Sequence, residues 1–126
     1  MSSDLIDRSA LVRLLEILGN DPAELEDLLA DYNEDAPELA RRIRDAAESG
    51  ETDALRIAAH SLKANARDFG ALHLSELCTG LEQDCIEGRT DNSKEAAVRI
   101  AQAESDAREA LAQIDFAALD GASGTG

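Results

Sequence analysis

One of the two histidines in the chain, His60, lies in a segment with helical periodicity and points away from its apolar side. If Leu62 marks the centre of the apolar face, His60 projects roughly 160° away from that centre. A histidine of the core would lie on the apolar face. Two interpretations of His60 therefore remain open: an ordinary surface histidine and a functional one. Neutral imidazole is a nucleophile near neutral pH, because its unperturbed pKa is about 6.5. An exposed imidazole here has the chemistry to accept a phosphoryl group.

Positively charged residues gather around this histidine in a chain whose formal net charge is −15. Lys63 follows one helical turn later, and Arg56 and Arg67 lie on the same outward side. Phosphoryl transfer needs an accessible nucleophile and positive charge near the transferred oxygens, and the ammonium group of Lys63 can supply that charge. The alternative is that these cations are solvated surface charges paired with Asp53 or Asp68. For Arg56 we weigh the two interpretations equally.

Small and apolar residues complete the outward face. Ile57 is a β-branched aliphatic residue that we expect to be exposed beside the imidazole, and Ala64 leaves the ring sterically open. An exposed imidazole framed by cations and a small apolar patch suits a nucleophile over which another protein docks.

Apolar residues recur three and four positions apart in five segments, which predicts five helices. We expect the first between Asp7 and Gly19, and the others at about 21–49, 52–69, 71–87 and 93–114. Pro37 lies inside the second stripe, whose register continues on both sides, so we predict one kinked helix. The fold class is therefore all-α: an up-down-up-down antiparallel four-helix bundle with a short additional N-terminal helix. We expect one domain over residues 1–119 and a flexible tail at 120–126.

Composition and charge narrow the classes of partner. The 27 acidic and 12 basic residues argue against nucleic acid and anionic membrane surfaces as partners. No apolar run is long enough for a membrane span and no signal peptide is recognisable, so we expect a cytoplasmic protein. Cys78 and Cys85 fit two buried, reduced thiols. With His73 they form no recognisable metal-ligand spacing, and we expect no metal site and no nucleotide site in this chain.

The segment around His60 also resembles a known signature. Bacterial histidine-containing phosphotransfer (HPt) domains carry the pattern AH-x-LK-G, followed a few residues later by GA. This chain has Ala59-His60-Ser-Leu-Lys63-Ala64 and then Gly70-Ala71. The resemblance runs from roughly Ile6 to Arg89 and includes Asp35-Ala36-Pro37 in the second helix and Leu74 to Glu82 in the fourth. The chain departs from the pattern at Ala64, where the family most often has glycine.

The resemblance implies a role for each matched residue. His60 would be the phosphorylated residue, Lys63 would support the phosphoryl group, and Gly70 would let the third and fourth helices pack closely. Receiver domains, whether of response regulators or of a hybrid sensor kinase, would dock over the surface formed by Arg56, Ile57, Ala64 and Arg67.

The implied function is that of a monomeric phosphoryl carrier rather than an enzyme. It would accept the group from a receiver aspartate and pass it to a response-regulator receiver. The chain would bind no cofactor itself, because the magnesium ion would belong to the receiver. A second hypothesis is a helical scaffold or anti-regulator that binds receivers without being phosphorylated.

Overall fold

The computed structural model describes residues 5–119, and this part of the chain is helical with no strand. The helices are α1 (Arg8–Ile17), α2 (Pro22–Ser49), α3 (Thr52–Asp68), α4 (Leu72–Ile86) and α5 (Ser93–Ala112). A further helical turn follows at 116–119. The all-α prediction is confirmed, and each of the five predicted helices is present to within a few residues.

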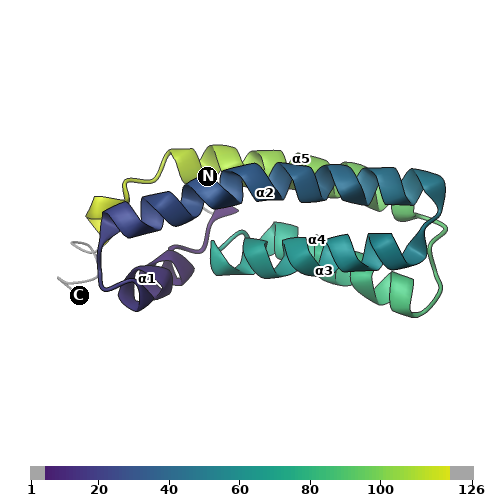
Figure 1. The fold of residues 1–126 in the computed structure, drawn as a ribbon, viewed down its shortest axis with the longest axis horizontal. Helices are drawn as coiled ribbons and strands as arrows, with labels where there is room; N and C mark the ends of the chain where they lie inside the picture. The colour runs from purple at the N-terminus through teal and green to yellow at the C-terminus, as the bar shows by residue number, and fades with distance from the viewer. Residues whose placement is uncertain (1–4, 120–126) are drawn as a thin grey trace.

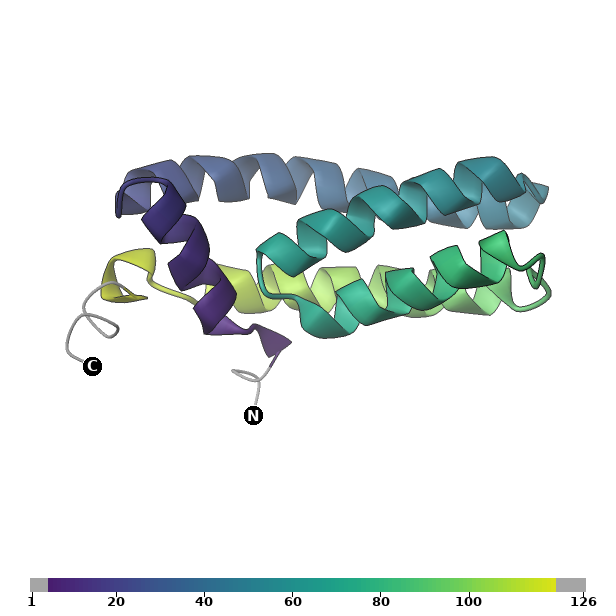
Figure 2. The same cartoon turned by 90° about the horizontal axis from the view of Figure 1, so that it is seen from below.

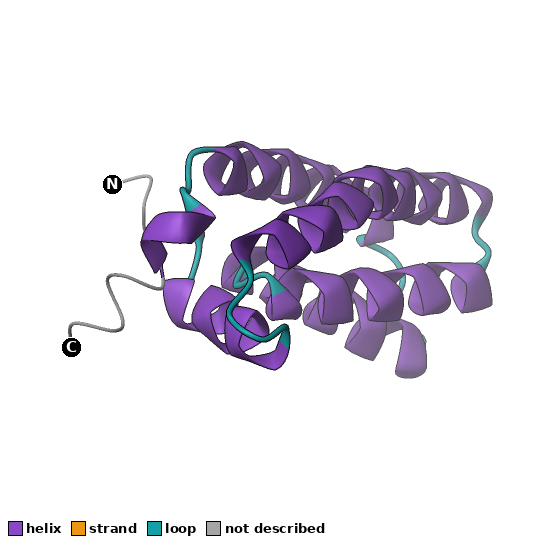
Figure 3. Cartoon of the chain, turned by 60° about the vertical axis from the view of Figure 1, so that its left-hand side comes forward, coloured by secondary structure: helices purple, strands orange, loops and turns teal. Residues whose placement is uncertain are grey.

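The four long helices form the predicted antiparallel bundle, in which each helix packs against the next and α5 closes against α2 (Figures 1 and 2). α1 lies across one end of the bundle and packs against α2 and α3 (Figure 2). Short loops join α2 to α3 and α3 to α4 (Figure 3). Such short connections make neighbouring helices antiparallel, and they place the middle of α3 opposite the second half of α4.

α2 begins as its sequence predicts and runs through Pro37 without interruption. Asp21 caps it, since its carboxylate accepts a hydrogen bond from the backbone N–H of Ala23 at 3.0 Å, and Pro22 occupies the first turn. Pro37 has no N–H to offer the carbonyl of Asn33 one turn earlier. The prediction of a single helix is confirmed, whereas the kink at Pro37 stays a prediction.

The core is built mainly from alanine and leucine, with an aromatic contact near one end. Tyr32 of α2 and Phe69, directly after α3, are buried with their ring centroids 4.8 Å apart. Within the described residues, the Tyr32 hydroxyl is buried without a hydrogen-bond partner. Glu104 of α5 is also buried, and its carboxylate is bound by the guanidinium of Arg108 at 2.5 Å.

The chain beyond α5 differs from the prediction. Ile114 was expected on the fifth helix, but it lies outside it and is half-buried. Phe116 and Leu119, to which no role was assigned, are buried in the core. The predicted flexible tail at 120–126 lies outside the described residues.

Candidate functional site

α3 presents His60 to solvent because its other face is held in the core. Leu55, Leu62 and Ala66 are buried on the inward side. The side chain of His60 is 61% exposed. The predicted orientation of this imidazole is therefore confirmed.

A single carboxylate, that of Glu82 on α4, contacts both polar groups of the predicted site. One of its oxygens, Oε2, lies 2.8 Å from Nδ1 of His60. The other, Oε1, accepts a hydrogen bond from Nζ of Lys63 at 2.6 Å. The Glu82 side chain is only 14% exposed, so these interactions are screened by water less than those of a surface pair.

The protonation state of Glu82 fixes the tautomer of His60. The hydrogen bond from Lys63 is the largest influence on Glu82 and holds the pKa of its carboxyl below the usual value of 4.5. An ionised carboxylate only accepts hydrogen bonds, so Nδ1 of His60 must be the donor. The lone pair of the neutral ring is then on Nε2. Within residues 5–119, Nε2 makes no hydrogen bond, so its lone pair is free to react with an incoming group.

Lys63 is less exposed than its sequence position suggests. Its side chain is 20% exposed, because α4 packs beside it and Glu82 binds its ammonium group. Lys63 was expected on the exposed, outward side of α3, and α4 covers most of its side chain instead. Ser75 of α4 is buried, and its hydroxyl donates to the backbone carbonyl of Lys63 at 3.3 Å, which ties α4 to this turn of α3.

Arg56 and Arg67 extend the positive face of α3 on either side of His60. Arg56 is half-buried and Arg67 is exposed. Neither forms an ion pair with another residue of the described part of the chain, so the expected alternative pairing with Asp53 or Asp68 is not seen. Both guanidinium groups remain available to an incoming anion or acidic surface.

The apolar part of the site is larger than the sequence indicated, because α2 contributes to it. Ile57 is 56% exposed, and Ala64 is half-buried. Ile57 lines a groove of about 450 Å³ between α2 and α3, with Leu39 and Ala46 of α2 on the opposite side. Arg41 and Arg42 of α2 also line this groove, and Glu38 and Asp45 bind their guanidinium groups.

Gly70 has a structural role at a contact that the sequence did not predict. It follows α3 with φ +76°, a conformation that side chains other than hydrogen disfavour. A Cβ atom at this position would overlap the backbone carbonyl of Asp7, whose N–H donates to the Gly70 carbonyl at 2.8 Å. Gly70 therefore admits the segment before α1, and its role in close packing of the third and fourth helices stays a prediction.

Other candidate chemistry in the described residues is sparse. His73 is exposed on α4, and Cys78 and Cys85 are buried free thiols, as expected. Among residues 5–119, no cluster of three metal-ligating side chains is found. In the same range, no helix has the length and apolar character needed to cross a bilayer.

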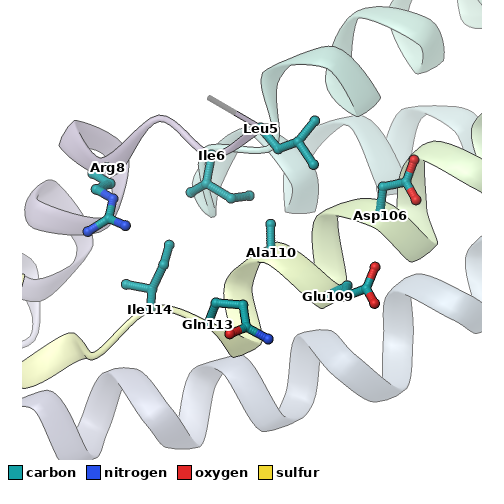
Figure 4. A pocket seen from close by; sticks show the side chains of 8 residues that line it. All are labelled: Leu5, Ile6, Arg8, Asp106, Glu109, Ala110, Gln113 and Ile114. Atoms are coloured by element: carbon teal, nitrogen blue, oxygen red, sulfur yellow. The ribbon is translucent and has the colours of Figure 1, made fainter. Parts of the chain in front are cut away.

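A separate hollow of about 330 Å³ lies between the N-terminal segment and α5 (Figure 4). Ile6, Ala110 and Ile114 give it an apolar floor, and charged side chains lie at its edge. Among the described residues that line it there is no histidine, cysteine, serine or threonine. The chemistry of the described residues therefore concentrates at His60.

Reasoning from the sequence missed the role of Glu82. The residue was noted only as part of the matched stretch of the fourth helix. On a helical projection it lies beside the buried positions Cys78 and Leu81, and an acidic residue there is a signal that it has a partner. The identity of that partner depends on the register between α3 and α4, which one sequence does not supply.

The chain was compared with known families and structures. The family model of the Hpt domain matches residues 27–120. This match begins and ends later than the resemblance seen in the sequence, so it leaves out α1 and includes α5. No match was found among the curated proteins.

One solved structure is similar over most of both chains. It is the crystal structure of histidine-containing phosphotransfer protein B (HptB) from Pseudomonas aeruginosa PAO1, with a TM-score of 0.78 and 26% sequence identity. The similar region covers 86% of this chain and 92% of that chain.

Proposed function

The chain belongs to the Hpt domain family, and we propose that it carries a phosphoryl group on His60 between receiver domains of a phosphorelay. His60 accepts the group from a phosphorylated receiver aspartate, and a response-regulator receiver takes it in turn. The observation that carries this proposal is the exposed imidazole whose Nδ1 is bound to Glu82, which leaves the lone pair on Nε2.

The transfer step needs no base from this chain. Nε2 attacks the phosphorus atom of the aspartyl phosphate, the phosphorus–oxygen bond breaks, and the aspartate leaves as a carboxylate. Because the nucleophile is already neutral, no proton has to be removed before attack. The exposure of the ring allows the in-line approach that phosphoryl transfer requires.

Lys63 steadies the negative charge of the transferred group. Its ammonium has three N–H donors, of which Glu82 accepts one, so two remain for phosphoryl oxygens. The magnesium ion and the remaining catalytic groups belong to the receiver, and this chain contributes the nucleophile, the lysine and the docking surface. In this role it is a monomeric covalent carrier.

The receiver docks over the face that contains Ile57, Ala64, Arg56 and Arg67. Ile57 and the groove beside α2 supply apolar contact area. The two arginines are positive charges on the surface of an otherwise strongly acidic chain. They attract negative charge, so they favour a partner whose own active site is acidic. The alternative function, a scaffold that binds receivers without being phosphorylated, would use the same face but would not need the imidazole.

The test is transfer from a radiolabelled, phosphorylated receiver domain to the purified chain. We expect the wild type to acquire label that is labile in acid and stable in base, as a phosphohistidine is, and His60→Gln to acquire none. His73→Gln is the matched control, because it removes the other histidine of the chain and should be labelled like the wild type. Receiver binding without label on the wild type would favour the scaffold.

A further inference from the structure

We propose that Ile86 of α4 is a second apolar anchor for the receiver, so that the partner covers α4 as well as α2 and α3, and Ile86 helps to determine which receivers bind. This inference rests on the proposed function and deepens it, because it adds a residue to the docking surface. Its basis is an exposed isoleucine one helical turn beyond Glu82, on the side of α4 that faces His60.

Ile86 lies on the same side of α4 as the residue that contacts the site. Glu82 binds both His60 and Lys63 of α3, and residues four apart on a helix share a face. α3 and α4 are antiparallel neighbours, so the turn after Glu82 on α4 lies level with the turn before His60 on α3 (Figure 2). Ile86 is therefore placed beside Arg56.

The surroundings of Cys85, the residue before Ile86, agree with this placement. Burial raises the pKa of the Cys85 thiol and the carboxylate of Asp84 raises it further, whereas the guanidinium of Arg56 lies close enough to lower it. Arg56 forms no ion pair with another residue of the range 5–119. An uncommitted positive charge therefore lies next to the exposed isoleucine and one turn from the imidazole.

The exposure of Ile86 is significant because of where it occurs. Single exposed apolar residues are common on protein surfaces and need no partner. Ile86, however, is 61% exposed beside an uncommitted cation, and Ile57 is 56% exposed on the other side of His60, where it lines the groove beside α2. The imidazole thus lies between two exposed isoleucines, one on the side of α2 and one on the side of α4.

This arrangement fits a partner whose acidic active site is surrounded by apolar side chains. Arg56 attracts the acidic site, and the two isoleucines lose water on contact and hold the partner in place. Contact on both sides of the imidazole also favours the in-line approach to phosphorus. A receiver that places a charged side chain over Ile86 would bury that charge without compensation, so Ile86 selects against it.

The experiment measures binding and phosphoryl transfer with a purified receiver domain that the wild-type chain binds. Ile86→Ser removes most of an exposed apolar side chain at the end of α4. We expect the variant to bind the unphosphorylated receiver roughly tenfold more weakly and to need roughly tenfold more phosphorylated receiver for half-maximal transfer. The rate at saturating receiver and the labelling of His60 by phosphoramidate should stay unchanged, because the reacting groups are intact.

Two further variants separate apolar contact from other effects. Val98→Ser is the matched control, because Val98 is a β-branched residue that is 67% exposed on α5. α5 packs against α2 and α4 and lies diagonally across the bundle from α3, so this variant should behave like the wild type. Ile86→Leu keeps the apolar area and should recover most of the affinity for the receiver.

Equal receiver affinity of the wild type and Ile86→Ser would overturn the inference, as would an equal loss in Val98→Ser. Self-association of the wild type that Ile86→Ser abolishes would assign Ile86 to a contact with a second copy of the chain, and would also overturn it. These results leave the proposed function standing, because His60 would still be labelled. Conversely, receiver binding without labelling would contradict the function, while the comparison of affinities would still decide the role of Ile86.

Discussion

A methyl group added at Gly70 tests how firmly the segment before α1 is held against the end of α3. Gly70→Ala places a side chain at φ +76°, which costs roughly 1–2 kcal/mol for the left-handed conformation alone. The new Cβ would also overlap the Asp7 carbonyl, so the two backbones must separate and the Asp7–Gly70 hydrogen bond is strained or lost. That bond contributes about 1 kcal/mol. Together these contributions should lower the free energy of unfolding by about 2–3 kcal/mol.

Gly50→Ala separates the two contributions. Gly50 ends α2 with φ +74°, almost the same backbone conformation, but nothing lies within 4 Å of the Cβ position. Alanine lowers the conformational entropy of the unfolded chain equally at both sites. This effect therefore cancels when the free energies of unfolding of the two variants are compared. We expect Gly50→Ala to lose only the conformational cost, roughly 1–2 kcal/mol.

The assay is urea unfolding followed by circular dichroism, together with hydrogen exchange at the Asp7 amide. Gly70→Ala should lose about 1 kcal/mol more than Gly50→Ala, and its Asp7 amide should exchange faster. Equal losses in the two variants would show that the N-terminal segment moves aside at no cost, which would refute the assignment of Gly70 to this contact.

Two further predictions concern the site. Lys63→Ala should keep the fold and lose roughly 1–2 kcal/mol in urea unfolding, between the values for exposed and buried pairs, while phosphotransfer from a receiver slows about tenfold or more. Unchanged transfer would remove Lys63 from the mechanism. The second prediction follows from the lowered pKa of Glu82. The ionised carboxylate stabilises the fold fully when the pH is above 4.5, the ordinary pKa of glutamate, and this stabilisation is lost as the pH falls through the lowered pKa. The stability of the wild type relative to Glu82→Gln should therefore decline below about pH 4.5, and a difference independent of pH would contradict the ionised pair.

The fold was predictable because the local sequence of each helix indicates where it begins and ends. Leucine and alanine recur at helical spacing, Asp21-Pro22 starts α2, and glycines follow the ends of α1 to α4, so number, order and pairing of the helices follow from short-range chemistry. The turn at 116–119 was missed because four residues are too short for a periodic pattern. Phe116 is buried only through contacts with the rest of the bundle.

Only the part of the site that lies on α3 was predictable from the sequence. His60 and its outward direction follow from the stripe on α3, and the neighbouring cations follow from the same projection. The position of Lys63 and the contribution of Glu82 depend on how α4 is shifted along α3. That register is set by packing of the whole core and by contacts such as the Ser75 hydroxyl on the Lys63 carbonyl. Interhelical pairs of this kind are invisible in a periodic pattern.

The contact between Tyr32 and Phe69 provides a built-in optical probe. The chain has no tryptophan and a single tyrosine, so ultraviolet emission comes essentially from one ring. The ring of Tyr32 is buried on α2 and packs against Phe69, which directly precedes the glycine that admits the N-terminal segment. Loosening at this end of the bundle, by mutation or when another protein is bound, can therefore be followed in the native chain without attaching a dye.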